Sequence, residues 1–236
     1  MIALVGGDGA AKTTAVKALD SWLSKHFDTT KVHMGTPAWS RPTTSFRAIL
    51  KVGQLLGFYP AESSMLETID QQSLISPGYP WLIREACLAR DRYHTYLKAK
   101  RFADRGGVTI IDRFPLPQLL LMDGPQAERF VGLLTEKRHD GPLMIPTRDS
   151  RVASFLMRLE ESYYDRIKAP ETLVVLRVDP EIAVQRKIDE DATLVRERST
   201  EIWRVDWEQT DAHVIDSSKS IDHVLRELKT FIWSKL

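Results

Sequence analysis

The sequence predicts an α/β fold in which a five-stranded, mostly parallel sheet has helices on both faces. Short runs of apolar and β-branched residues alternate with longer segments that have helical periodicity. The runs at Ile2–Val5 and Val108–Ile111 are almost wholly apolar, as expected of interior strands that are covered on both faces. A glycine-rich turn follows the first run and leads directly into a helical pattern. We therefore expect these two strands to lie side by side or close together.

The elements follow one another in a regular alternation. Five segments rich in apolar and β-branched residues are the predicted strands: Ile2–Val5, Thr30–Met34, Val108–Ile111, Thr172–Val178 and Ala212–Ile215. Eight segments with apolar residues at helical spacing are the predicted helices: 13–26, 43–57, 80–105, 126–137, 150–168, 180–189, 195–206 and 219–235. Irregular stretches at Gly35–Pro42 and Phe114–Pro125 follow predicted strands, so we expect them to be substrate loops.

Composition excludes several classes of protein. Lys plus Arg (33) nearly balances Asp plus Glu (32), which gives no overall basic field for binding a nucleic-acid polymer. The single cysteine, Cys87, excludes an internal disulfide and a cluster of cysteine metal ligands. No apolar run approaches the roughly 20 residues that a membrane helix needs. These features predict a cytoplasmic protein without a membrane or nucleic-acid partner.

A phosphate-binding turn is the strongest signal. Residues 6–13 read Gly-Gly-Asp-Gly-Ala-Ala-Lys-Thr and fit the pattern G-x-x-x-x-G-K-[ST], with Ala11 in place of the last glycine. Small residues let backbone N–H groups approach phosphate oxygens, and the helix that follows adds a favourable dipole. Lys12 is predicted to contact the β- and γ-phosphates, and Thr13 to bind Mg²⁺. The methyl group of Ala11 fits the turn if its φ is negative.

Several segments resemble those of thymidylate kinases. Residues 7–14 are similar to the phosphate loop of that family, D-G-A-G-K-[ST]-T. Ala89-Arg90-Asp91-Arg92 resembles its helical D-R, and Ile111-Asp112-Arg113-Phe114 its later D-R-[YF]. Residues 176–186 resemble its strand, D-x-P-E turn and lid-leading helix, and residues 214–221 its last strand and helix. Since the matches keep their order along the chain, the resemblance implies one P-loop kinase domain (1–236), with three layers and a small mobile lid at about 187–199.

The resemblance also implies roles for the matched positions. Residues of the donor side would bind ATP: Gly7, Gly9, Ala10, Ala11, Lys12, Thr13, Thr14 and Arg186. Catalytic residues would be Lys12, Asp8, Asp112, Arg113, Arg196 and Arg198, of which Arg196 and Arg198, with Arg186, belong to the lid. The acceptor would contact Asp8, Leu88, Arg92 and Arg113, and Mg²⁺ would contact Thr13 and Asp112. Thymidylate kinases are commonly homodimers, so a homodimer is expected. These parts suit phosphoryl transfer, which depends on positioning and charge neutralisation.

The departures from the family pattern fall on the acceptor side. Met34–Arg41 replaces the family's Arg-Glu-Pro-Gly-Gly loop, and Leu88 replaces an aromatic residue that stacks on thymine. Phe114–Gln118 replaces a small polar run. The sequence therefore defines the phosphoryl donor better than the acceptor.

Each of these residues also has a purely structural interpretation. Asp112-Arg113 could be a surface ion pair, Arg90–Arg92 a solvated helix face and Arg196–Arg198 a solvated charged segment. Trp39 could stack on a ligand or cover the core, and Tyr163-Tyr164 could line an acceptor pocket or pack. The histidines lack metal-ligand spacing, so a zinc site is not expected.

The sequence predicts a P-loop kinase that transfers the γ-phosphoryl group of ATP, with Mg²⁺, to a small acceptor. A nucleoside monophosphate is the first choice, because its ionised phosphate needs no general base. One alternative is a hydroxyl acceptor, a nucleoside or a sugar-like metabolite. Deoxynucleoside kinases have a Glu just after the second strand, whereas Met34–Arg41 contains no carboxylate, so Asp8 or Asp112 would act as the base for another alcohol. Another is a nucleotide-binding module without catalysis, to which Ala11 lends support.

Overall fold

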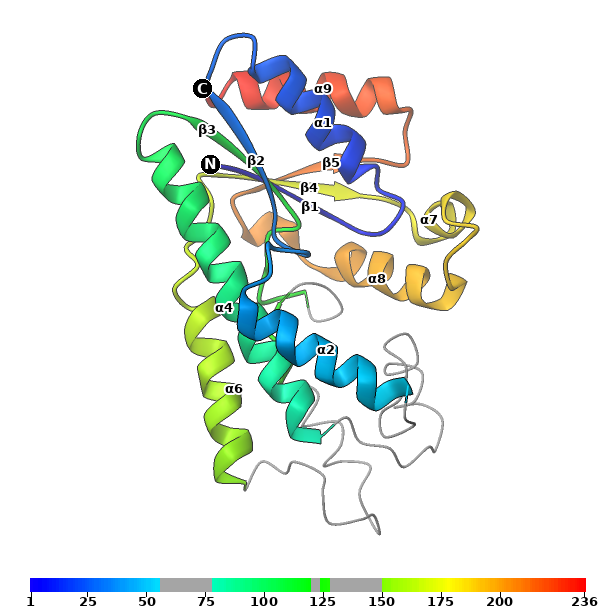
Figure 1. Ribbon diagram of the computed structural model, residues 1–236. Coiled ribbons are helices and arrows are strands. Elements are labelled where there is room, and N and C mark those ends of the chain that lie inside the picture. Colours follow the sequence, from blue (N-terminus) through cyan, green and yellow to red (C-terminus); the bar gives the residue numbers. More distant parts are fainter. Residues whose placement is uncertain (56–77, 120–123, 128–149) are drawn as a thin grey trace. The chain divides into compact units, whose positions relative to one another are not determined.

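The computed structural model describes residues 1–55, 78–119, 124–127 and 150–236 (Figure 1). It confirms the α/β fold, with a five-stranded, all-parallel sheet in the order β2-β3-β1-β4-β5. The strands are β1 (Ile2–Gly6), β2 (Thr29–His33), β3 (Val108–Asp112), β4 (Thr172–Arg177) and β5 (Ala212–Asp216). The helices are α1 (Lys12–Leu23), α2 (Arg41–Leu55), α4 (Gly78–Ala103), α6 (Arg151–Tyr164), α7 (Pro180–Arg186), α8 (Ala192–Arg204) and α9 (Ile221–Trp233), with a 3-10 turn η1 at Trp207–Gln209.

The predicted neighbours β1 and β3 are paired. Ile2 is in register with Ile110, and Leu4 with Asp112. All five residues of each of these strands are buried, which explains why their sequences are mostly apolar. The two strands therefore end side by side at the same edge of the sheet.

Helix boundaries differ from the sequence expectations where side chains cap the ends. Helix α8 begins at Ala192, earlier than expected, because the carboxylate of Asp191 accepts a hydrogen bond from Leu194 N at 2.9 Å. The chain before it has already left the helical conformation, since α7 ends at Arg186. The predicted helix at 126–137 lies outside the described residues, apart from its first two positions.

The chain divides into two compact units. Residues 1–37, 95–124 and 168–236 form the sheet unit, which holds the five strands of the described residues. Residues 38–94 and 125–167 form the helical unit, which holds α2, α6 and most of α4. Helix α4 runs from one unit into the other. The expected single kinase domain over 1–236 stays a prediction.

Helices cover both faces of the sheet within the sheet unit. Helices α1 and α9 lie on one face of the sheet (Figure 1). They pack there on apolar side chains of alternating strand positions, among them Leu4, Ile110 and Leu176. On the other face, the end of α4 is tied to β3, because Thr109 Oγ1 donates to Ala99 O at 2.9 Å. This alternation fixes which strand residues face each layer.

The helical unit has a small core of its own. Trp81, Leu82 and Ala86 of α4 pack with Ala153 and Leu156 of α6. The start of α6 is capped by Ser150, whose hydroxyl accepts from Ala153 N and lies 2.7 Å from Tyr79 Oη.

Candidate phosphate-binding site

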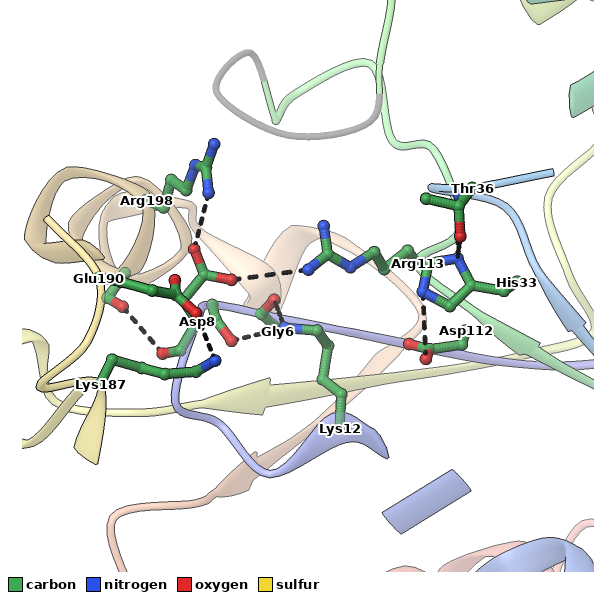
Figure 2. A network of polar contacts seen from close by, with 12 residues as sticks. Gly6, Asp8, Lys12, His33, Thr36, Asp112, Arg113, Lys187, Glu190 and Arg198 are labelled. Atoms are coloured by element: carbon green, nitrogen blue, oxygen red, sulfur yellow. Dashed lines mark hydrogen bonds and ion pairs between the residues drawn. The ribbon is translucent and has the colours of Figure 1, made fainter. Parts of the chain in front are cut away.

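The predicted phosphate loop lies at the carboxyl edge of the sheet, between β1 and α1. Lys12 is the first residue of α1, and its side chain is buried. Its ammonium group donates to Gly6 O at 2.7 Å and to Gly7 O at 2.6 Å (Figure 2). The lysine is therefore folded onto the carbonyl groups of its own loop.

Close packing explains the glycines of this loop. A Cβ atom at Gly7 would come within 2.8 Å of Ser199 Oγ and 3.1 Å of Ser199 Cα on helix α8. Gly9 has a φ of +75°, and a Cβ there would lie 3.1 Å from the backbone of Ala183. Both positions need glycine, one for space and one for conformation as well.

Ala11 does not have the negative φ that would accommodate its methyl group. Its φ is +57° and its ψ is 24°, in the left-handed region. This backbone conformation costs an L-residue roughly 1–2 kcal/mol relative to the right-handed one. The loop thus keeps the conformation that glycine normally provides, with alanine in its place.

Asp8 lies between two arginines from distant parts of the chain (Figure 2). Arg198 Nη1 of α8 donates to Asp8 Oδ2 at 2.9 Å, and Arg113 Nη2, after β3, lies 3.7 Å from Asp8 Oδ1. Burial alone would raise the pKa of Asp8. The hydrogen bond from Arg198 and the charges of Lys12, Arg198 and Arg113 outweigh burial and lower that pKa below its ordinary 3.8. Asp8 is therefore held ionised.

Asp112 and Arg113 are not a solvated surface pair. The side chain of Asp112 is buried, and Arg113 has a φ of +57°. His33 Nε2 lies 3.7 Å from Asp112 Oδ2, whereas Oδ1 is buried and has no hydrogen-bond partner. A buried carboxylate oxygen without a partner is costly and calls for a functional explanation.

The residues predicted to hold Mg²⁺ are compatible with that ion. The unpartnered Asp112 Oδ1 is a hard oxygen ligand, and Thr13 is exposed at the start of α1. Among the described residues there is no group of three or more His, Cys, Asp or Glu side chains that could hold a metal. An ion here would thus depend on phosphate oxygens and water for its remaining ligands, which is how Mg²⁺ commonly binds beside nucleotides.

The predicted lid segment, 187–199, includes most of helix α8. Val195, Ser199 and Ile202 are buried, and Ser199 packs on the phosphate loop. Arg198 reaches Asp8, and its Nε atom is buried without a hydrogen-bond partner. Whether this segment moves stays a prediction.

The other two arginines of the predicted lid make different contacts. Arg186, on α7, donates to three carbonyl oxygens: Gly9 O at 3.2 Å, Ser217 O at 2.8 Å and Ser218 O at 3.2 Å. It therefore links the phosphate loop to the loop after β5. Arg196 is exposed and pairs with Glu181 through two hydrogen bonds of 2.7 and 3.0 Å. Its described partner lies on α7, not in the phosphate loop.

The acceptor-side residues Leu88 and Arg92 lie on the part of α4 that belongs to the helical unit. Both are buried, so the Arg90–Arg92 segment is not simply a solvated helix face. Arg92 donates to the hydroxyl group of Tyr164 on α6. The neighbouring Asp91 is 3% exposed and accepts from Ser40 N at 2.9 Å and from Thr43 Oγ1 at 2.6 Å.

Sequence reasoning missed three contributors to these sites. Ser199 sets the space above Gly7, His33 approaches Asp112, and Asp91 anchors the loop before α2. Only Asp91 had a signal, because it belongs to the D-R pair. The other two become visible only when distant segments are brought together.

Comparison with known proteins gives distant relatives of matching length. The chain is 25% identical over 230 residues to the "Uncharacterized ATP-binding protein YghR" of Escherichia coli strain K12. The protein of the same name from Escherichia coli O6:H1 strain CFT073 gives the same identity. Each alignment covers 96% of this chain and 84% of the relative. No known protein-family profile matches the chain. In the described part of the chain, no helix is both long and apolar enough to cross a membrane.

Proposed function

We propose that this protein is an ATP- and Mg²⁺-dependent P-loop kinase that transfers the γ-phosphoryl group to a nucleotide phosphate, as thymidylate kinases do. The observation that carries the proposal is the arrangement at the carboxyl edge of β1 and β3. There Lys12, Asp8, Asp112, Arg113 and Arg198 come together around one phosphate loop. The names of the two distant relatives support ATP as the donor.

In the proposed phosphoryl transfer, each residue of this site has a role that is compatible with its position. Lys12 would leave the carbonyl groups of Gly6 and Gly7 and bind the β- and γ-phosphates. Arg113 and Arg198 would neutralise charge on the acceptor phosphate and the transferred group, and the unpartnered Nε of Arg198 is a donor for an anionic oxygen. Asp112 Oδ1 and Thr13 would hold Mg²⁺, which when bound neutralises charge on the β- and γ-phosphates.

The geometry favours a phosphate acceptor over a hydroxyl acceptor. A hydroxyl acceptor benefits from a carboxylate that can take its proton. Asp8 is a poor base, because both of its oxygens face arginines and its pKa is lowered. Asp112 Oδ1 is the one observation that favours a hydroxyl acceptor, since it is a carboxylate oxygen without a partner. An acceptor phosphate needs no base and benefits from both arginines.

The decisive experiment combines binding and turnover. ATP·Mg²⁺ is titrated calorimetrically, and ADP release is measured over a panel of nucleoside monophosphates, nucleosides and sugars. We expect binding and turnover with a nucleoside monophosphate. Binding with no turnover on any acceptor would leave a nucleotide-binding module, which the left-handed Ala11 makes physically reasonable.

Two lysine variants test whether turnover depends on the phosphate loop in particular and not on any lysine of the helix that follows it. Lys12→Ala should reduce turnover by orders of magnitude, because the β- and γ-phosphates lose their cation. Lys17→Ala, on the exposed side of the same helix, should leave turnover unchanged. Near-normal turnover of Lys12→Ala, with an unchanged circular dichroism spectrum, contradicts the proposed site.

Arg113→Ala tests the nature of the acceptor. If the acceptor carries phosphate, this change should raise the KM for the acceptor by at least ten-fold, which is about 1.4 kcal/mol, and change the KM for ATP much less. Unchanged acceptor kinetics would favour an uncharged acceptor.

A further inference from the structure

His33 is the last residue of β2 and lies beside Asp112, the last residue of β3. The two residues are directly in register in the parallel ladder, and Met34 N donates to Asp112 O at 2.9 Å. Both residues belong to the sheet unit, so the fold of that unit alone brings their side chains together. The carboxyl ends of parallel strands form the edge at which ligands bind in open α/β sheets.

The loop after β2 fixes the orientation of the His33 ring and the position of its proton. Thr36 N donates to His33 Nδ1 at 3.0 Å, and Thr36 Oγ1 lies 3.1 Å from the same nitrogen (Figure 2). Because Nδ1 accepts the hydrogen bond from the Thr36 amide, the ring proton is on Nε2. Nε2 is the nitrogen that faces Asp112, 3.7 Å from Oδ2. His33 therefore directs an N–H donor at one oxygen of this carboxylate.

The two carboxylate oxygens of Asp112 have different surroundings. Oδ2 faces the histidine, whereas Oδ1 is buried and has no hydrogen-bond partner. The His33 side chain is 42% exposed, so packing of the core does not explain its place beside a carboxylate that is 9% exposed. A separation of 3.7 Å is longer than a hydrogen bond, and the hydrogen bonds of catalytic groups commonly shorten when the ligand binds.

We infer that His33 is a positioning residue of the metal site: its Nε2–H holds Asp112 Oδ2, so that Oδ1 stays available to the Mg²⁺ ion of Mg²⁺·ATP. The inference rests on the proposed kinase function and adds a residue to its metal site. Carboxylates that bind metals are usually hydrogen-bonded in turn, and loss of the outer partner costs about 10- to 100-fold in metal affinity or activity. The role needs only the neutral ring and its donor.

A matched pair of amide variants separates the two ring nitrogens of His33. In His33→Asn the amide oxygen can accept from Thr36 N in place of Nδ1, but no donor reaches Asp112. In His33→Gln the longer side chain can place an amide N–H where Nε2 was, while the contact with Thr36 is lost. If His33 only anchors its loop, Asn is the milder change. If it positions Asp112, Gln is the milder change.

Binding of Mn²⁺ gives a readout that does not depend on turnover. Mn²⁺ takes the same oxygen ligands as Mg²⁺, and electron paramagnetic resonance measures its free concentration. It is titrated into protein that is in excess over a nonhydrolysable ATP analogue. We expect the Kd for Mn²⁺ to rise by about ten-fold or more in His33→Asn and to stay within about three-fold of wild type in His33→Gln. An unchanged Kd in His33→Asn, or an equal rise in both variants, overturns the inference.

Two further variants show where His33 acts. Added to Asp112→Asn, His33→Asn should raise the Kd for Mn²⁺ by less than about two-fold, because the group that His33 positions is already lost. Full additivity of the two changes contradicts the inference. His26→Asn makes the same substitution at an exposed histidine beyond the far end of α1, and it should leave the Kd unchanged.

The outcomes distinguish this inference from the kinase proposal. If the wild type binds Mn²⁺ with the ATP analogue but phosphorylates no acceptor, the kinase proposal fails, and the His33 variants still decide whether His33 supports the metal site. If the wild type binds no Mn²⁺ with the analogue, both are wrong. If the wild type is an active kinase and His33→Asn binds Mn²⁺ as tightly as wild type, only the role of His33 is wrong.

Discussion

Two single residues carry unusual backbone conformations, and both were predicted as site residues. Among the described non-glycine residues, Ala11 and Arg113 alone have positive φ, and each has a value of +57°. Such conformations cost of order 1–3 kcal/mol and persist where the surrounding structure enforces them, often at functional sites. The Ala11 strain has a sequence signal, because the motif has glycine there. The Arg113 strain has none, since it arises from the turn that follows β3.

The strain at Ala11 predicts an unusual substitution. Ala11→Gly should stabilise the protein by about 1 kcal/mol, because glycine adopts the left-handed conformation without a Cβ penalty. Unfolding by urea, followed by circular dichroism, measures this change. The neighbouring Ala10→Gly is the control and should destabilise, because Ala10 is buried, lies outside the left-handed region and would lose a packed methyl group. Destabilisation by Ala11→Gly would show that the loop gains nothing from glycine.

At the scale of elements, two arginines on α8 should contribute very differently to the stability of that helix. Arg198 donates a hydrogen bond to the buried Asp8, whereas Arg196 pairs with Glu181 at the exposed surface. Arg198→Ala leaves a buried carboxylate without its closest partner, which should cost about 1–3 kcal/mol. Hydrogen exchange of the α8 amides should speed up in Arg198→Ala and change little in Arg196→Ala. Equal effects of the two changes would mean that the Asp8 contact does not hold α8.

Helix α6 contributes a group that makes stability depend on pH. Glu160 is 2% exposed and accepts from Gln126 N at 3.0 Å and Ala127 N at 2.8 Å. Burial and the nearby charge of Glu85 raise its pKa to about 7, against the two backbone hydrogen bonds and Arg92, which lower it. The folded state therefore binds this proton more tightly than the unfolded state, where the pKa is near 4.5.

The contribution of protonated Glu160 to the free energy of unfolding is fully present below pH 4.5 and is lost as the pH rises through about 7. The loss is at most about 3–4 kcal/mol, at 1.36 kcal/mol per pKa unit. Glu160→Gln should reduce the fall in unfolding free energy between pH 5 and pH 8. Exposed Glu161, next to it on α6, provides the control, and Glu161→Gln should keep the wild-type pH dependence. An unchanged slope in Glu160→Gln would mean that Glu160 ionises normally.

At the scale of the whole molecule, the sheet was predictable and much of the site's detail was not. A run of mostly apolar residues such as Val108–Ile111 indicates a strand that is buried on both faces. Such a strand is expected in the interior of a parallel sheet. The contact of Arg198 with Asp8 joins residues 190 positions apart, and no local pattern encodes it. The burial of Asp91 depends on a loop about 50 positions earlier, which the sequence leaves unspecified. Long-range polar contacts follow from the fold and cannot be inferred before it.

Ligand binding by the proposed kinase should stabilise the whole protein through mass action. A ligand at a hundred times its Kd adds about 2.7 kcal/mol to the stability of a protein that binds it only when folded. For a chain of this size that corresponds to a rise in Tm of roughly 5–10 °C. Differential scanning fluorimetry with saturating ATP·Mg²⁺ measures this rise, and Lys12→Ala should abolish it.

The dependence of this Tm rise on metal tests Asp112 in particular. Removal of Mg²⁺ with EDTA should reduce the effect of ATP in the wild type, because the unpartnered Asp112 Oδ1 then has no cation to bind. In Asp112→Asn the rise with ATP should be smaller and should depend less on Mg²⁺, since an amide oxygen binds the ion more weakly than a carboxylate. A Mg²⁺ dependence equal to that of the wild type would remove Asp112 from the metal site and leave its buried oxygen for the alternative role of a general base.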